Sequence, residues 1–294
     1  MEYNGYKLVE IDGRVEVHGI RDFDLVQTFE CGQCFRWNRN TDGSYTGVVN
    51  GKVTRVSLDL GVLTLTNCTI DDFTGFWYEY FDLGRDYGGI KKTLGFDPIL
   101  KKSAEFGSGI RLLKQDIREV LISFILSANN RIPRIMKTVE ELSKIFGEKL
   151  EYQDTTYYSF PQLEALSVTD LQRLEICKGG FRCKYIKGAS QMVEQKKIDL
   201  LSLKSMEIGA AREELMQLPG VGPKVADCIL LYSGTKYEVF PTDVWVKRVM
   251  EQLYFKRNAG FKEIQDFARQ HFGELAGFAQ QYLFYYARKN KIGV

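Results

Sequence analysis

The sequence is poor in the features that mark a membrane protein or a metalloprotein. Its 294 residues include only two histidines and six cysteines, and no apolar run approaches the roughly 18 residues that cross a bilayer. Cys31 and Cys34 form a C-x-x-C pair, but a zinc site needs four ligands and no second pair exists. We therefore expect no membrane span, no metal or other cofactor, and reduced cysteines, as in a cytosolic protein.

The N-terminus also lacks a basic stretch followed by an apolar one, which is the pattern of a secretory leader. We expect an intracellular protein, in the cytoplasm with the nucleoid or in the nucleus. Internal repeats, low-complexity tracts and long linkers are absent as well. The length is compatible with one large domain or two of medium size.

Overall charge carries little information, because the net charge is only +2. The charges are unevenly distributed, however. Residues 181–294 contain 18 Lys and Arg against 12 Asp and Glu, whereas residues 1–180 contain 22 against 26. A local basic surface of this kind is typical of nucleic-acid binding, and a solvated basic face is the alternative.

The order of elements predicts an α+β fold in which an antiparallel sheet comes first. Residues 6–67 read as strands, including Tyr6–Ile11 and Val62–Thr66. Hairpin turns are predicted at Asp12-Gly13, Asp42-Gly43 and Asn50-Gly51. From Thr69 onward helical periodicity dominates, as in residues 117–126 and 135–145. With a boundary near Gly107-Ser108-Gly109, we expect a sheet domain with short helices over residues 1–108 and a helical domain over residues 109–294.

Residues 211–233 predict two helices joined by a tight turn. The first ends at Pro219 and Gly220, and the second has Pro223 in its first turn, a position that favours proline. Glycines let a backbone approach a partner closely, and the free N–H groups at a helix start suit a phosphate. The turn Gly220-Val221-Gly222 thus predicts a helix-hairpin-helix for a DNA backbone, with an ordinary glycine-linked helix pair as the alternative.

Two charged residues at and after this turn are candidates for catalysis. Lys224 lies in the first turn of a helix, where the dipole repels a cation by roughly 0.3–1 kcal/mol. Burial and that dipole favour a neutral amine, which can attack an electrophilic carbon; a lysine that binds a phosphate is the alternative. Asp243 precedes a third helix, where it is an N-cap, a catalytic carboxylate, or both.

These residues and three further stretches resemble the 8-oxoguanine DNA glycosylase/lyase family of the HhH-GPD superfamily of base-excision repair enzymes. The stretches are Cys31-Gly32-Gln33-Cys34-Phe35-Arg36-Trp37, Arg111–Asp116 continuing to Ser127-Ala128-Asn129-Asn130, and Gly277–Phe284. The resemblance extends from about Phe23 to about Lys289. It implies a TBP-like sheet domain followed by an all-helical HhH-GPD region, acting as a monomer on duplex DNA.

The resemblance also implies how the damaged base is removed. Lys224 would attack C1′ of the flipped nucleotide and form a Schiff base, which permits β-elimination, and Asp243 would oppose the positive charge developing on the sugar. In the pocket, the Gly32 carbonyl would accept from the N7–H that distinguishes 8-oxoguanine from guanine. Gln280 would bind the Watson–Crick edge, and Cys228 and Phe284 would sandwich the ring.

Four more residues match family positions that face the opposite strand. Asn129, Arg134 and Arg182 would contact the orphaned cytosine, and Phe181 would act as a wedge. The chain also departs from the family pattern. Trp245 replaces a phosphate-contacting histidine and Ala287 replaces its acidic partner, while the four-cysteine cluster of some relatives is absent because no cysteine follows Cys228.

Three functions are consistent with the sequence. The first is a bifunctional glycosylase/lyase for 8-oxoguanine, preferably opposite cytosine. The second is an HhH-GPD glycosylase for another damaged purine, in which Lys224 only contacts phosphate. The third is a non-catalytic helix-hairpin-helix protein that binds DNA without regard to damage.

Overall fold

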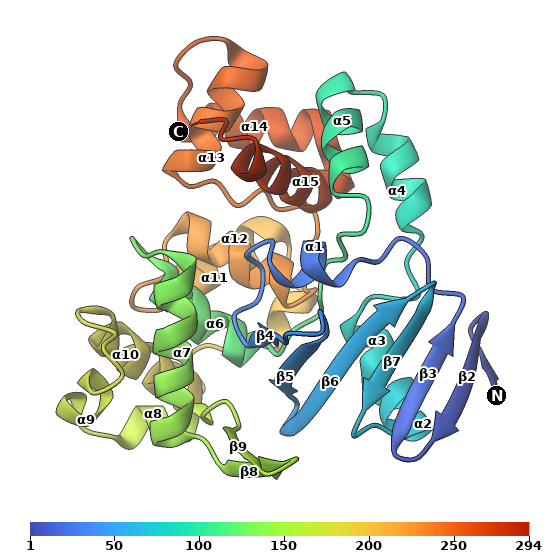
Figure 1. The fold of residues 1–294 in the computed structure, drawn as a ribbon. Helices are drawn as coiled ribbons and strands as arrows, with labels where there is room; N and C mark the ends of the chain where they lie inside the picture. The colour runs from blue at the N-terminus through green and yellow to red at the C-terminus, as the bar shows by residue number, and fades with distance from the viewer. Residues whose placement is uncertain (294) are drawn as a thin grey trace.

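The computed structural model describes residues 1–293 and begins with the predicted antiparallel sheet. Seven strands pair in the order β1-β2-β3-β7-β6-β5-β4, and Figure 1 shows this sheet beside the helical part of the chain. The strands are β1 (Glu2–Tyr3), β2 (Tyr6–Ile11), β3 (Arg14–His18), β4 (Trp37–Arg39), β5 (Tyr45–Val49), β6 (Lys52–Asp59) and β7 (Val62–Thr66). The α+β fold with the sheet first is confirmed.

Tight turns set the register of the sheet. Asp12-Gly13 joins β2 to β3, and Asn50-Gly51 joins β5 to β6; all four residues have positive φ, as a two-residue hairpin turn requires. Leu60-Gly61 makes the same turn between β6 and β7. We did not predict this turn, because leucine rarely adopts positive φ; its side chain is 96% exposed.

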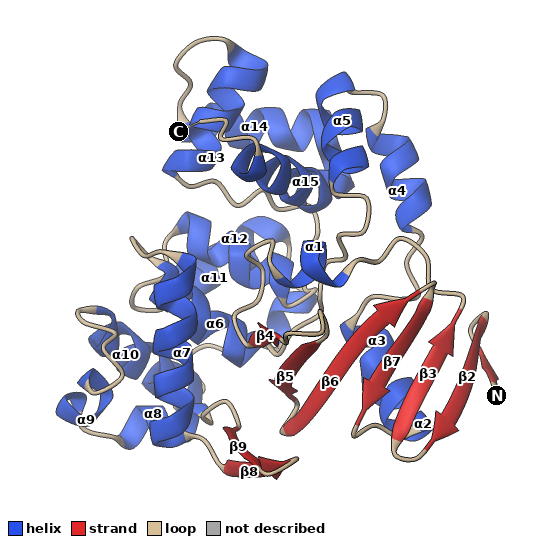
Figure 2. Ribbon diagram, in the orientation of Figure 1, coloured by secondary structure: helices blue, strands red, loops and turns tan. Residues whose placement is uncertain are grey.

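Helices make up most of the chain after the sheet (Figure 2). Residues 70–106 contain α2 (Ile70–Asp72), α3 (Tyr78–Tyr80), α4 (Tyr87–Leu94) and α5 (Pro98–Phe106), and α1 (Leu25–Phe29) lies between strands. The later helices are α6 (Ile117–Ser127), α7 (Ile132–Phe146), α8 (Leu163–Val168), α9 (Leu171–Glu175), α10 (Arg182–Glu194), α11 (Ile208–Met216), α12 (Pro223–Tyr232), α13 (Val244–Met250), α14 (Phe261–Phe272) and α15 (Ala276–Lys289). Within residues 1–293 no helix has the length and apolarity of a membrane span.

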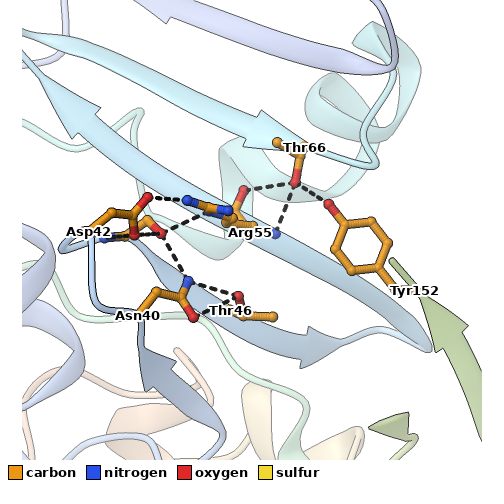
Figure 3. A network of polar contacts seen from close by, with 7 residues as sticks. Asn40, Asp42, Thr46, Arg55, Thr66 and Tyr152 are labelled. Carbon is orange, nitrogen blue, oxygen red and sulfur yellow. Dashed lines mark hydrogen bonds and ion pairs between the residues drawn. The ribbon is translucent and has the colours of Figure 1, made fainter. Parts of the chain in front are cut away.

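One hairpin interrupts the helical region, and we did not predict it. β8 (Lys149–Tyr152) and β9 (Thr155–Tyr158) pair through Gln153 and Asp154, which both have positive φ. The Tyr152 hydroxyl lies 2.7 Å from Thr66 Oγ1 on β7. Figure 3 shows this contact continuing through Arg55 to Asp42 and Asn40, so the hairpin is tied to the sheet.

Two hydrophobic clusters form the interior. Residues of the sheet pack against the α2–α3 segment, where the rings of Trp77 and Phe81 stack 5.5 Å apart. The second cluster contains the later helices together with α4 and α5, and α5 packs on α15. The division at residue 108 remains a proposal about independently folding units; α4 and α5, which precede it, share their core with the helices that follow it.

Replacement of Gly277 tests the packing of α15 on α12. An added Cβ would lie 2.3 Å from Leu231 Cδ1 and 2.7 Å from the Tyr237 carbonyl oxygen. We expect Gly277→Ala to lower the free energy of unfolding by about 1–3 kcal/mol, measured by urea denaturation. Gly209→Ala is the control, because no atom lies within 4 Å of its Cβ position. An equal effect of both substitutions would contradict the packing.

Candidate active site

The predicted helix-hairpin-helix is formed by α11, the turn and α12. Gly220 has φ +82°, and a Cβ there would lie 2.8 Å from Tyr185 Cβ, so this position requires glycine. Gly222 caps α12 without a side-chain hydrogen bond, and the space beside it is open. The N–H groups at the start of α12 therefore remain available to a phosphate.

Behind the turn lies a cavity of about 170 Å³. It is lined by all six residues predicted for catalysis and base recognition: Gly32, Lys224, Cys228, Asp243, Gln280 and Phe284. The cavity is several times the roughly 30 Å³ share of one water in the liquid. A larger hollow of about 490 Å³ beside the N-terminus of α6 contains none of these residues.

Lys224 projects from the first turn of α12 toward the end of α6. Its Nζ lies 3.4 Å from Ser127 Oγ and 5.2 Å from the centre of the Phe124 ring. Lys224 forms no ion pair with another of residues 1–293. Asp243 lines the same cavity but is not paired with the Lys224 amine. The sequence did not predict that Ser127 and Phe124 lie beside Lys224, because their proximity follows only from the packing of α12 on α6.

Asp243 forms the N-cap of α13, as one of its predicted roles requires. Its Oδ1 accepts a hydrogen bond of 2.7 Å from the Val246 N–H. The side chain is half-buried and lines the same cavity as Lys224. The cap therefore holds a carboxylate in a defined orientation at the cavity, where it can oppose a developing positive charge.

The recognition residues approach the cavity from three directions. Gly32 has φ +95°. A Cβ added at this residue would lie 3.4 Å from Phe284 Cε1, so the Phe284 ring lies close beside the loop of Gly32. Gln280 is 3% exposed and its Oε1 has no hydrogen-bond partner, which leaves an unpaired acceptor at the cavity wall. Burial raises the pKa of the Cys228 thiol to about 11, although Lys224 acts in the opposite direction. The Cys228 thiol is therefore uncharged at physiological pH and forms part of the cavity wall.

The residues predicted to face the opposite strand lie beside the cavity and differ in exposure. Asn129 and Arg134 are exposed, and 53% of Phe181 is exposed. The Phe181 ring lies 4.4 Å from Arg182 Cζ. An exposed ring on a cationic support is suited to unstacking a base step.

Arg182 differs from Arg134, because it is only 5% exposed. It donates four hydrogen bonds to backbone carbonyls, at Ala128 through Nε and Nη2, at Asn129 (2.8 Å) and at Gly179 (3.3 Å). A guanidinium has five N–H donors. Four of these donors are in use and one N–H of Nη1 has no partner among residues 1–293, so the predicted contact between Arg182 and cytosine remains a prediction. In this structure Arg182 holds the loop of Asn129.

Trp245 packs against the recognition wall. Its ring meets the Phe284 ring edge to face, with centroids 5.0 Å apart. Trp245 and Arg288 line a shallow groove that shares Asp243 and Phe284 with the cavity. Residues 1–293 contain no cluster of His, Cys, Asp and Glu side chains that could hold a metal ion.

Comparison with known families agrees with this geometry. Residues 17–121 match the family model described as the N-terminal domain of 8-oxoguanine DNA glycosylase, and residues 122–274 match the model of HhH-GPD superfamily base excision DNA repair proteins. The fold and the site thus define an HhH-GPD protein of base excision repair. Within that superfamily, the chain belongs to the 8-oxoguanine DNA glycosylase family.

Individual relatives extend over most of the chain. N-glycosylase/DNA lyase OGG1 of Arabidopsis thaliana is 31% identical over 288 residues, which cover 90% of this chain and 77% of the relative. A probable N-glycosylase/DNA lyase of Methanothermobacter thermautotrophicus is 36% identical over 66% of this chain and 68% of the relative. The solved structure of Clostridium acetobutylicum 8-oxoguanine glycosylase/lyase with double-stranded DNA containing cytosine opposite 8-oxoG has a TM-score of 0.95. It is 46% identical, and the match covers 97% of this chain and 99% of that chain.

A buried ion pair between the hairpin helices makes stability depend on pH. Asp227 is 1% exposed and lies 2.7 Å from Arg212 Nε; burial raises its pKa to about 6, and Arg212 opposes this increase. A raised pKa in the folded state stabilises the fold below the unfolded value near 3.8, and this contribution is lost as pH rises through 6.

We therefore expect the difference in unfolding free energy between the wild type and Asp227→Asn to change with pH. It should shift in favour of the wild type, by on the order of 3 kcal/mol, when the pH falls from 7 to 4. Urea denaturation at several pH values measures this difference. A difference that is constant over this range would show that Asp227 titrates normally.

Proposed function

We propose that this protein is a bifunctional DNA glycosylase and lyase that excises 8-oxoguanine from duplex DNA. One observation carries the proposal: a single cavity unites the amine of Lys224, the carboxylate of Asp243 and the recognition residues Gly32, Gln280 and Phe284. A passive DNA clamp needs the hairpin but has no need for this cavity. We further propose that the protein acts as a monomer, in the nucleoid or the nucleus.

Excision begins when the hairpin and the exposed Phe181 ring hold the duplex while the damaged nucleotide swings into the cavity. Lys224 then attacks C1′, so that a C1′–N bond forms as the bond to the base breaks and the base leaves with the electron pair. Asp243 stabilises the positive charge on the sugar during this step. The Lys224 nitrogen gives one proton to the departing base. The C1′–O4′ bond of the sugar then breaks, O4′ takes up a proton, and the nitrogen forms a protonated imine with C1′. The imine acidifies the C2′ hydrogens, so that loss of a C2′ proton forms the C2′=C3′ double bond and the 3′ phosphate leaves with the electron pair of its C3′–O bond.

Recognition of the lesion uses the cavity walls. A carbonyl at Gly32 attracts the N7–H of 8-oxoguanine and repels the N7 lone pair of guanine. Gln280 has an unpaired buried acceptor for the N–H groups of the Watson–Crick edge. Phe284 and Cys228 supply apolar surfaces for the two faces of the ring. Another damaged purine without N7–H would leave the Gly32 carbonyl unpaired.

Borohydride trapping tests the covalent step. With an 8-oxoguanine duplex, the wild type should form a permanent protein–DNA adduct, because borohydride reduces the Schiff base on Lys224. Lys224→Gln should trap at least 100-fold less, on the order of the loss of a nucleophile. Lys262→Gln, on a side chain that is 92% exposed, should trap as the wild type does. Full trapping and cleavage by Lys224→Gln would exclude the mechanism.

Excision opposite each of the four bases tests the role of Arg134. We expect preference for cytosine, whose acceptor edge suits a guanidinium, and we expect Arg134→Met to reduce that preference by about 10-fold. Lys137→Met, one turn further along α7 and also exposed, is the control. An unaltered preference in Arg134→Met would assign the reading of cytosine to other residues.

A further inference from the structure

We infer that Gln281 is a positioning residue that sets the preference for the damaged base, because it holds the loop of Gly32 in place. The inference rests on the proposed function, in which the Gly32 carbonyl reads the lesion. Gln281 does not line the cavity. It acts through the neighbouring peptide group.

The Gln281 side chain links α12 to the recognition loop. It is 1% exposed, and its Oε1 accepts a 2.9 Å hydrogen bond from the Tyr232 hydroxyl at the end of α12. Its Nε2 donates to the Cys31 carbonyl at 3.4 Å. The Cys31 carbonyl can only accept, so it fixes the NH2 end of the amide toward the loop, and the Tyr232 hydroxyl, which can donate or accept, then donates to the amide oxygen.

The carbonyl on the other side of Gly32 is also held. Gln115 Nε2 donates to the Gln33 carbonyl at 2.8 Å, and the backbone N–H of Gln115 bonds to the Tyr232 carbonyl at 3.1 Å. Within residues 1–293, no hydrogen bond reaches the carbonyl of Gly32 itself. The loop thus carries one unpaired acceptor between two anchored carbonyls.

Anchoring matters at this position because glycine resists rotation poorly. Gly32 has φ +95° and no side chain to limit its backbone. Without the Gln281 bond, the peptide between Cys31 and Gly32 can rotate, and the Gly32 carbonyl moves with it. A single acceptor distinguishes N–H from a lone pair only while it points at N7, so a mobile carbonyl loses discrimination before the fold is lost.

Gln280 and Gln281 are neighbours on α15 and have different roles in this proposal. Successive helix residues point about 100° apart, and accordingly Gln280 faces the cavity while Gln281 faces the loop. The two substitutions should therefore differ in effect. Loss of Gln280 removes a contact with the base, whereas loss of Gln281 removes the support of another contact.

Equilibrium binding in a Lys224→Gln background tests this assignment without turnover. Affinities are measured at one salt concentration for duplexes with 8-oxoguanine, guanine and an abasic site. Gln281→Met keeps the length of the side chain and removes its donor. Tyr232→Phe keeps the ring, which lines the cavity, and removes only the hydroxyl that donates to Gln281. Gln191→Met is the matched control, because Gln191 also donates to a backbone carbonyl, that of Ser167, away from the cavity.

We expect Gln281→Met to reduce the preference for 8-oxoguanine over guanine by about 5- to 10-fold, the effect of one hydrogen bond. Tyr232→Phe should cause a smaller loss in the same direction, and Gln191→Met none. A merely structural role would weaken binding to all three duplexes equally, and that result would overturn the inference. If Gln281→Met misfolds, Tyr232→Phe with full preference would overturn it. If the Lys224→Gln protein itself shows no preference for 8-oxoguanine, that result would instead reject the proposed function, and the inference with it.

Discussion

The burial of α12 is the constraint on which the rest of the site depends. Every residue from Val225 to Tyr232 is buried, and the helix packs on α6, where the rings of Tyr232 and Phe124 stack 5.1 Å apart. Only its first turn reaches the surface. One rigid element therefore has free N–H groups at its start, which we propose bind the DNA backbone, carries Lys224 at the cavity, and places Cys228 one turn deeper in the cavity wall. In the proposed mechanism, DNA binding and catalysis depend on the same helix, so the reacting groups need little rearrangement when DNA binds.

Much of this architecture could be predicted because it follows from local rules. The strands Tyr6–Ile11 and Val62–Thr66 were predicted at their observed bounds, and Pro223 was predicted in the first turn of α12, since turn residues and a proline mark these elements. The Leu60-Gly61 turn and the β8–β9 hairpin carry no such signal. In both, residues with ordinary side chains adopt positive φ because the pairing of the flanking strands requires it.

Like the fold, the site has some features that could be predicted from the sequence and others that could not. Its six cavity residues are recognisable in sequence because each lies in a distinctive motif, and folding brings them together. The contacts that position them are not recognisable, since they join residues far apart in the chain. Gln281 and Cys31 are 250 positions apart, and Arg182 and Ala128 are 54 apart. Arg134 and Arg182 were both predicted to contact the opposite cytosine, and the sequence did not predict that Arg134 is exposed whereas Arg182 is buried and bonded to backbone carbonyls.

The start of α13 couples the catalytic carboxylate to the recognition wall. Asp243 accepts from the Val246 N–H, and Trp245, between them, packs its ring on Phe284. A shift of this helix end would move the carboxylate and the supporting aromatic together. Trp245 stands where the family resemblance predicts a histidine, and its ring gives apolar support to Phe284, the ring that we propose faces the base.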